Sequence, residues 1–118
     1  MRWRSTVMER AFVQASAILT LSRELPRHGP QFRHIADQLF RSASSVGACL
    51  EEAEAASSRR EMAHKQGIAL REAREAEYWL RMLIRADVMT DQLLPLRKEA
   101  GELVAILTVS VKKLRETD

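Results

Sequence analysis

Five acidic and imidazole side chains near the middle of the chain are the first candidates for chemistry. Glu51, Glu52 and Glu54 precede a serine pair, and Glu61 with His64 forms a Glu-x-x-His spacing just after it. Di-iron centres in helix bundles use this spacing, but they need two such motifs and two further carboxylates from other helices. Because the chain has one such motif, we expect solvated surface charge at these positions, with no metal and no cofactor.

Nucleophilic catalysis has no recognisable set of residues. The single cysteine, Cys49, has no histidine at a spacing that suggests a thiolate–imidazole pair, and no glycine-rich phosphate loop precedes a predicted helix. We expect Cys49 to be a small, semi-buried side chain, and its lack of a disulfide partner fits a reducing, cytoplasmic compartment. The sequence therefore predicts no enzymatic activity and no catalytic residue.

Basic side chains are concentrated in the third quarter of the chain. Residues 57–86 carry seven Lys or Arg against four Glu, in a chain of net charge +3. A basic face on a helix can bind the phosphates of RNA or DNA. The candidate nucleic-acid-binding residues are Arg59, Arg60, His64, Lys65, Arg71 and Arg74, with Arg2, Arg4 and Arg10 as possible additions.

A salt-bridged, solvated face is the alternative interpretation of the same charges. Acid and base stand four residues apart at Glu61–Lys65, Arg71–Glu75 and Glu77–Arg81. This is the spacing of intrahelical ion pairs, so the basic residues can be neutralised within their own helix.

Apolar residues at three- and four-residue spacing predict an all-α fold. We expect helices over residues 6–25, 31–55, 59–86 and 91–116. The short connections between long helices predict an antiparallel up-down-up-down four-helix bundle, as a single domain over residues 1–118. No run approaches the roughly 18 apolar residues that a membrane span needs, so no membrane association is expected.

Capping residues and prolines place the helix starts. Thr6 with Glu9 and Ser58 with Glu61 match the capping box, in which a Ser or Thr is followed three residues later by Glu. We expect the other first turns to use Pro30, Thr90 and Pro95.

Two further packing features follow from the spacing. The buried stripe expected in the first helix is Met8, Ala11, Phe12, Ala15, Ile18, Leu19, Ser22 and Leu25. Small residues should let the second and third helices approach closely, and Gly47 and Gly67 either serve this packing or lie at exposed sites.

The register of the second and third helices predicts ion pairs between them. If the hairpin centre lies between residues 56 and 57, Arg41 can meet Glu72 or Glu75. The same register lets Glu51 and Glu52 reach basic residues early in the third helix, such as Lys65.

The run from residue 78 to 84 is apolar around most of the helix circumference. A surface helix normally shows one apolar stripe, and large exposed apolar patches are uncommon on monomers. We therefore expect a homo-oligomer, with Tyr78, Trp79, Met82 and Ile84 as interface candidates. The alternative is that loops or the N-terminal arm with Trp3 cover this face.

Residues 41–83 resemble the signature of a bacterial four-helix-bundle family, the 23S rRNA intervening-sequence proteins. The matching positions are Arg41, Ser42, Ser45, Gly47, Ala48, Glu52, Ala53, Ser58, Lys65, Ile68, Ala69, Glu72, Ala73, Glu75, Tyr78, Trp79 and Leu80. Among them, Arg41, Gly47, Glu52, Glu72 and Glu75 are expected to be structural. Cys49, Leu50 and Met62 stand where the family usually has Asn, Tyr and Phe, which puts in doubt any function that rests on that Asn.

The resemblance implies a non-enzymatic bundle that assembles into a ring-like homopentamer. Related accessory proteins of diversity-generating retroelements work beside a reverse transcriptase and have a basic, nucleic-acid-binding surface. The expected role is a scaffold or accessory factor that binds nucleic acid or an RNA-handling partner. A protein-protein interaction module without nucleic-acid binding is the alternative.

Overall fold

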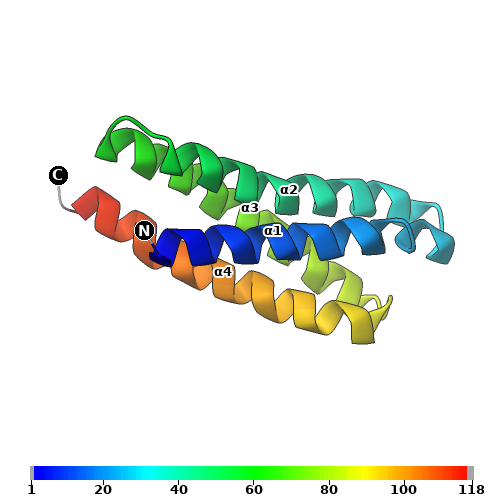
Figure 1. The fold of residues 1–118 in the computed structure, drawn as a ribbon. Helices are drawn as coiled ribbons and strands as arrows, with labels where there is room; N and C mark the ends of the chain where they lie inside the picture. Colours follow the sequence, from blue (N-terminus) through cyan, green and yellow to red (C-terminus); the bar gives the residue numbers. More distant parts are fainter. Residues whose placement is uncertain (1, 117–118) are drawn as a thin grey trace.

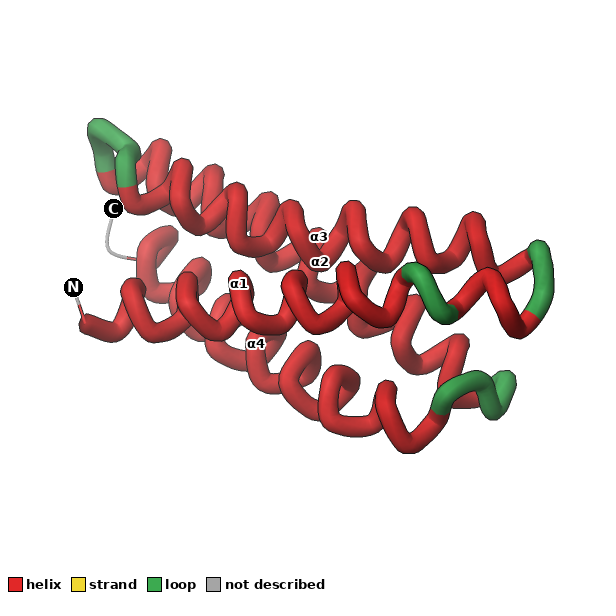
Figure 2. Tube along the Cα trace, turned by 45° about the vertical axis from the view of Figure 1, so that its right-hand side comes forward, coloured by secondary structure: helices red, strands yellow, loops and turns green. Residues whose placement is uncertain are grey.

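The computed structural model describes residues 2–116 of the chain, with side chains from Thr6 onward. These residues form α1 (Arg2–Ser22), the short 3-10 helix η1 (Leu25–His28), α2 (Gln31–Glu54), α3 (Arg59–Arg85) and α4 (Thr90–Glu116). Each α-helix runs back along its predecessor (Figure 1). The connection between α2 and α3 lies at the opposite end from the other two connections (Figure 2). The all-α prediction is therefore confirmed.

Both ends of α1 differ from the prediction. The helix begins at Arg2 instead of Thr6, because residues 2–5 contain no Pro or Gly and helix propagation continues through them. It ends at Ser22, before η1, whose second residue is Pro26. Gly29 then adopts φ 150°, a conformation that favours glycine, and turns the chain into α2.

The start of α3 is the predicted capping box, with one difference. Ser58 is extended, and its Oγ accepts a hydrogen bond from the Glu61 N–H at 3.1 Å. The Glu61 carboxylate returns to Ser57, where it accepts hydrogen bonds from the backbone N–H and from Oγ, both at 3.4 Å. Two polar groups that the helix leaves unpaired are satisfied in this way.

The predicted start of α4 at residue 91 agrees with the structure to within one residue, but the predicted capping role of Thr90 is wrong. Thr90 is the first helical residue, and its hydroxyl donates to Asp87 Oδ1 at 2.9 Å instead of capping the helix. Asp87 and Met89 have positive φ values of 58° and 50°, which make the connection from α3 sharp. Since α4 begins at Thr90, Pro95 lies in its second turn and not in its first. Pro30, similarly, precedes the first residue of α2.

The orientation of α1 also differs from the predicted stripe. Val7, Ala11, Gln14 and Ile18 are buried, whereas Phe12 is 67% exposed. The Gln14 amide can be buried because its Nε2 donates to the backbone oxygen of Leu96 on α4, at 2.7 Å. Leu19, also placed in the predicted stripe, is 53% exposed. The α1 helix therefore turns a second apolar face away from the core.

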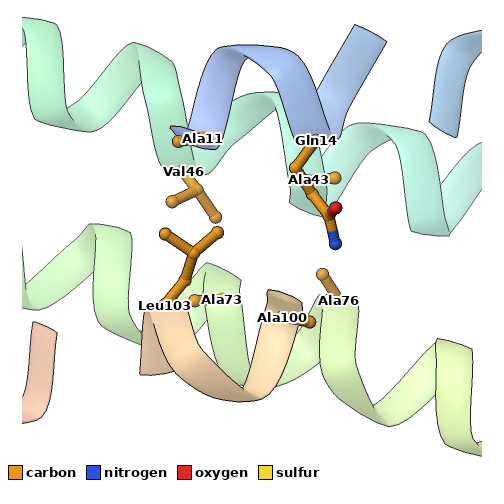
Figure 3. Close-up of a pocket in the computed structure, with 8 residues that line it drawn as sticks. All are labelled: Ala11, Gln14, Ala43, Val46, Ala73, Ala76, Ala100 and Leu103. Atoms are coloured by element: carbon orange, nitrogen blue, oxygen red, sulfur yellow. The ribbon is translucent and has the colours of Figure 1, made fainter. Parts of the chain in front are cut away.

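Small side chains from all four helices meet at the centre of the bundle. They surround a cavity of about 10 Å³, about the volume that one water needs, and point towards one another in Figure 3. The lining residues are Ala11, Gln14, Ala43, Val46, Ala73, Ala76, Ala100 and Leu103. The predicted close approach of α2 and α3 is explained by the alanines among these residues. Gly47 faces α1 and not α3, and a Cβ at this position would make an ordinary van der Waals contact with the Ala11 Cβ, at 3.8 Å.

Candidate nucleic-acid interface

One face of α3 presents arginines along almost its whole length. Arg60, Arg71, Arg74, Arg81 and Arg85 follow the spacing of a single helical face, and all five are exposed. We call these five residues the arginine stripe; at 1.5 Å per residue it is about 38 Å long. His64 lies on the same face and is also exposed. The stripe extends past the predicted site, which stopped at Arg74.

None of the four acids of α3 pairs with the stripe: Glu72, Glu75 and Glu77 face cations of other helices, and Glu61 accepts hydrogen bonds at the start of α3. Glu72 and Glu75 both accept hydrogen bonds from Arg41 of α2, with an Arg41 Nη1 to Glu72 Oε1 distance of 3.2 Å. Glu77 lies 3.9 Å from Arg97 of α4. Among the residues that the structure describes, no acid forms an ion pair with a stripe arginine.

The predicted alternative, a face neutralised by intrahelical pairs, is therefore wrong. Its three pairs fail because each acid has a better-placed partner: Glu61 caps the helix, Glu75 binds Arg41 and Glu77 faces Arg97. For Glu75 and Glu77 the preferred partner is a cation on a facing helix, and of the two cations the sequence had placed Arg41 but not Arg97.

The Arg41 cluster is also the strongest electrostatic feature of the helix pair α2 and α3. Hydrogen bonds from Arg41 and from Trp79 Nε1, at 3.0 Å, hold the pKa of Glu75 below its ordinary value of 4.5. The hydrogen bond with Glu75, together with the charges of Glu72 and Glu75, raises the pKa of Arg41. The predicted pairing of Arg41 with Glu72 or Glu75 is thus confirmed, and Arg41 makes both pairs.

Glu52 holds another of the predicted basic residues. Lys65 Nζ lies 2.9 Å from Glu52 Oε1, which raises the pKa of Lys65. Lys65 is therefore neutralised and lies beside the stripe.

Cys49, near Lys65, is partly buried, and this desolvation raises the pKa of its thiol, with smaller contributions from Glu52 and Glu72. A thiol with a raised pKa is a poor nucleophile at neutral pH.

Arg59, one of the six predicted binding residues, and Arg10, one of the predicted additions, are engaged elsewhere. Arg59 donates to the backbone oxygens of Lys113 and Leu114, at 3.3 and 3.4 Å, and so covers the last carbonyls of α4. Arg10 donates to Glu99 at 2.6 Å and to Glu102 at 2.7 Å, which ties α1 to α4. The side chains of Arg2, Arg4 and Trp3 lie outside the described residues.

Arg115 of α4 adds a cation that sequence reasoning missed. Its Nη2 lies 2.9 Å from the position of a Cβ at residue 67, so Gly67 leaves room for the guanidinium. A hollow of about 300 Å³ lies in the basic face between Arg60 and Arg71, and its lining includes His64, Gly67, Arg71 and Arg115.

The sequence signal that would have found Arg81 and Arg85 is the continuation of the Arg71–Arg74 spacing along the same helix face.

The four interface candidates divide into two pairs. Tyr78 is 46% exposed and Met82 37%. Trp79 and Ile84 are half-buried and pack against the core. More apolar surface is exposed on α1, where Phe12 and Leu19 border a hollow of about 510 Å³ between α1 and α2.

The residues considered for a metal site lie near the α2–α3 connection but do not come together as a ligand set. Glu51, Glu52 and Glu54 are exposed at the end of α2, while Glu61 caps α3 and His64 belongs to the basic face. Within residues 2–116, no three His, Cys, Asp or Glu side chains come together as a metal-binding set. No described helix is both long enough and apolar enough to cross a bilayer.

Comparisons with known proteins give one family. The family model described as 23S rRNA-intervening sequence protein matches residues 4–109. A crystal structure of a Bacteroides thetaiotaomicron protein of unknown function, from the S23 ribosomal protein family, is 32% identical. It superposes with a TM-score of 0.82 over 92% of this chain and 97% of that chain. Curated proteins give no match. The chain therefore belongs to the 23S rRNA-intervening sequence protein family.

Proposed function

We propose that this protein is a non-enzymatic scaffold of the cytoplasm that binds nucleic acid through the arginine stripe and works beside an RNA-handling partner, such as a reverse transcriptase. The observation that carries the proposal is the unneutralised stripe. Five exposed guanidinium groups share one face of α3, and no acid of the same helix forms an ion pair with them.

The dimensions and chemistry of the stripe suit a polyanion. Its length of about 38 Å spans roughly eleven phosphates at 3.4 Å per phosphate along one strand. Arginine binds phosphate through two parallel hydrogen bonds, and each phosphate that it neutralises releases counterions into solution. Arg115, beside Gly67, widens the basic face at the middle of the stripe.

A charge-reversal experiment tests this proposal. The variant Arg60→Glu/Arg71→Glu/Arg74→Glu reverses the first three charges of the stripe. A matched control, Arg23→Glu/Arg33→Glu/Lys98→Glu, makes the same change in net charge at exposed positions outside it. Fluorescence anisotropy with a labelled oligonucleotide at low salt should show a loss of at least about tenfold for the stripe variant and less than about threefold for the control.

Two results would contradict the proposal. One is that wild-type protein binds no oligonucleotide at low salt. The other is that both variants lose the same affinity, which would mean that net charge and not the stripe determines binding.

We also propose that the protein self-associates, with a homopentamer as the expected form, through the second apolar face of α1. Phe12, Val13 and Leu19 are each more than half exposed, and Phe12 and Leu19 line the hollow between α1 and α2. A separate apolar hollow on α4, with Val109 at 55% exposure, offers a different surface for the neighbouring copy. Two unlike surfaces on one chain suit the head-to-tail contacts that close rings.

The Tyr78 and Met82 pair is less suited to self-association. Both lie among stripe arginines, so a second copy of this face would bring like charges together.

Light scattering should give an oligomer for wild type and a monomer for Phe12→Lys/Leu19→Lys, with unchanged helix content by circular dichroism. A wild-type monomer at micromolar concentration would refute self-association.

A protein-protein interaction module without nucleic-acid binding is the second candidate function. The exposed apolar face of α1 favours it, because such a face needs a cover. This candidate is preferred if the wild-type protein binds no oligonucleotide and is a monomer, because the α1 face is then left for a different protein.

A further inference from the structure

We infer that the arginine stripe takes a single-stranded polynucleotide and that Tyr78 is the platform on which one of its bases stacks. This inference rests on the proposed function and specifies its ligand. A basic groove with interleaved aromatic side chains is the usual arrangement of proteins that bind single strands.

Tyr78 has the required position. It lies on the same face of α3 as the stripe, four residues after Arg74 and three before Arg81. Tyr78 is 46% exposed, so its ring is accessible from the solvent between the two arginines. A strand whose phosphates follow the arginines would therefore pass its bases across this ring.

The ring is also held in place from below. Tyr78 packs edge-to-face on Trp79, with the ring centroids 5.4 Å apart and an interplanar angle of 69°. Trp79 Nε1 donates to Glu75 at 3.0 Å, and Glu75 is held by Arg41 of the neighbouring helix. An aromatic side chain that is fixed before binding loses little conformational entropy when a base stacks on it.

Arg81 strengthens the same platform. Its guanidinium carbon lies 5.9 Å from the centre of the Tyr78 ring, within the range of a cation–π contact. Arg81 lies over one face of the ring, so a base would stack on the opposite face, and the guanidinium would be available to a neighbouring phosphate. The bases of a duplex are stacked on one another inside the helix, so a duplex can use the arginines but not the ring.

The experiment compares single strands and a duplex on three variants. Labelled oligo(rU) and oligo(dT) of about 16 nucleotides, within known site sizes, and a duplex of the same length are titrated at low salt. Tyr78→Ala removes the ring, Tyr78→Phe keeps it, and Met82→Ala is the control, since Met82 is an exposed apolar neighbour on α3 with no aromatic ring.

We expect Tyr78→Ala to weaken single-strand binding about tenfold and duplex binding less than twofold, because stacking on an aromatic residue acts on single strands alone. Tyr78→Phe and Met82→Ala should bind as wild type does. The salt dependence should not change in Tyr78→Ala, because no charge is removed. A preference for oligo(rU) or for oligo(dT) identifies RNA or DNA as the natural source.

The inference is overturned if Tyr78→Ala binds single strands as tightly as wild type, or if the duplex binds more tightly than both single strands. Either result leaves the scaffold proposal standing as long as binding still depends on the stripe charges. Absence of all binding would overturn both.

Discussion

Replacing Arg41 by Ala should destabilise the bundle more than replacing an ordinary surface arginine. Arg41 bridges α2 to two acids of α3, and its side chain is 45% exposed while those of Glu72 and Glu75 are 22% and 34% exposed. Exposed ion pairs contribute about 0.2–1 kcal/mol each, so two pairs with partly shielded carboxylates contribute about 1 kcal/mol. In a domain of this size that corresponds to a decrease in Tm of about 4 °C.

The control and the assay follow from the same helix. Arg33 of α2 is exposed and forms no side-chain ion pair with any described residue, so Arg33→Ala should change the free energy of unfolding by less than about 0.5 kcal/mol. Thermal and urea unfolding, followed by circular dichroism, measure both variants. Equal decreases in Tm for the two variants would refute the reasoning.

The pH dependence gives a second check on Arg41. Because Arg41 and Trp79 lower the pKa of Glu75 in the folded chain, this group stabilises the fold at pH values above the ordinary 4.5. Its contribution is lost as the pH falls through the lower folded-state pKa. The cost of Arg41→Ala should therefore be larger at pH 7 than at about pH 3. An equal cost at both pH values would mean that Arg41 acts by packing and not by charge.

Three further substitutions test other parts of the fold. Leu80→Ala and Ser58→Ala are followed by the same unfolding measurements, and Arg10→Ala is followed by hydrogen exchange. Leu80→Ala, at a side chain with 0% exposure, should lower the free energy of unfolding by about 2–5 kcal/mol; a cost below about 1 kcal/mol would contradict its place in the core. Ser58→Ala removes the cap of α3 and should cost about 1 kcal/mol, whereas Ser57→Ala should cost less. Arg10→Ala breaks the contact between α1 and α4, so hydrogen exchange of α1 should rise more than that of α2; an equal rise would argue against this tie.

Helices α2 and α3 could be predicted closely from the sequence. Their apolar and small residues repeat on one face, and the Ser58–Glu61 capping box fixes the start of α3. The hairpin register then places Arg41 opposite Glu72 and Glu75, as observed. Local rules were sufficient here because each local preference agrees with the tertiary packing.

Helix α1 could not be oriented from its sequence. Its apolar residues cover more than one side, so spacing alone does not select the buried stripe. Burial of Gln14 depends on an acceptor from another helix, the Leu96 oxygen, and this side chain competes with Phe12 for the core. A buried amide with a partner from a distant segment has no local sequence signal.

The candidate site was predicted in part for a related reason. Arg60, His64, Arg71 and Arg74 could be found from composition and helical spacing. That they are free of ion pairs with the described residues could be predicted only in part: the α2 register placed Arg41 opposite Glu72 and Glu75, but the partner of Glu77, Arg97, lies on α4, whose register against α3 the sequence does not fix. The contribution of Arg115 depends on the close approach of α4 to Gly67, which the sequence does not fix.

The salt dependence of oligonucleotide affinity tests the central claim, the unneutralised stripe, most directly. If a single strand contacts the five stripe arginines, the logarithm of the affinity should fall with the logarithm of salt concentration with a slope of about −3.5, since each contact contributes about 0.7. Reversal of Arg60, Arg71 and Arg74 should reduce the steepness of this slope by about 2. An identical slope for wild type and variant, or an affinity independent of salt, would contradict the account.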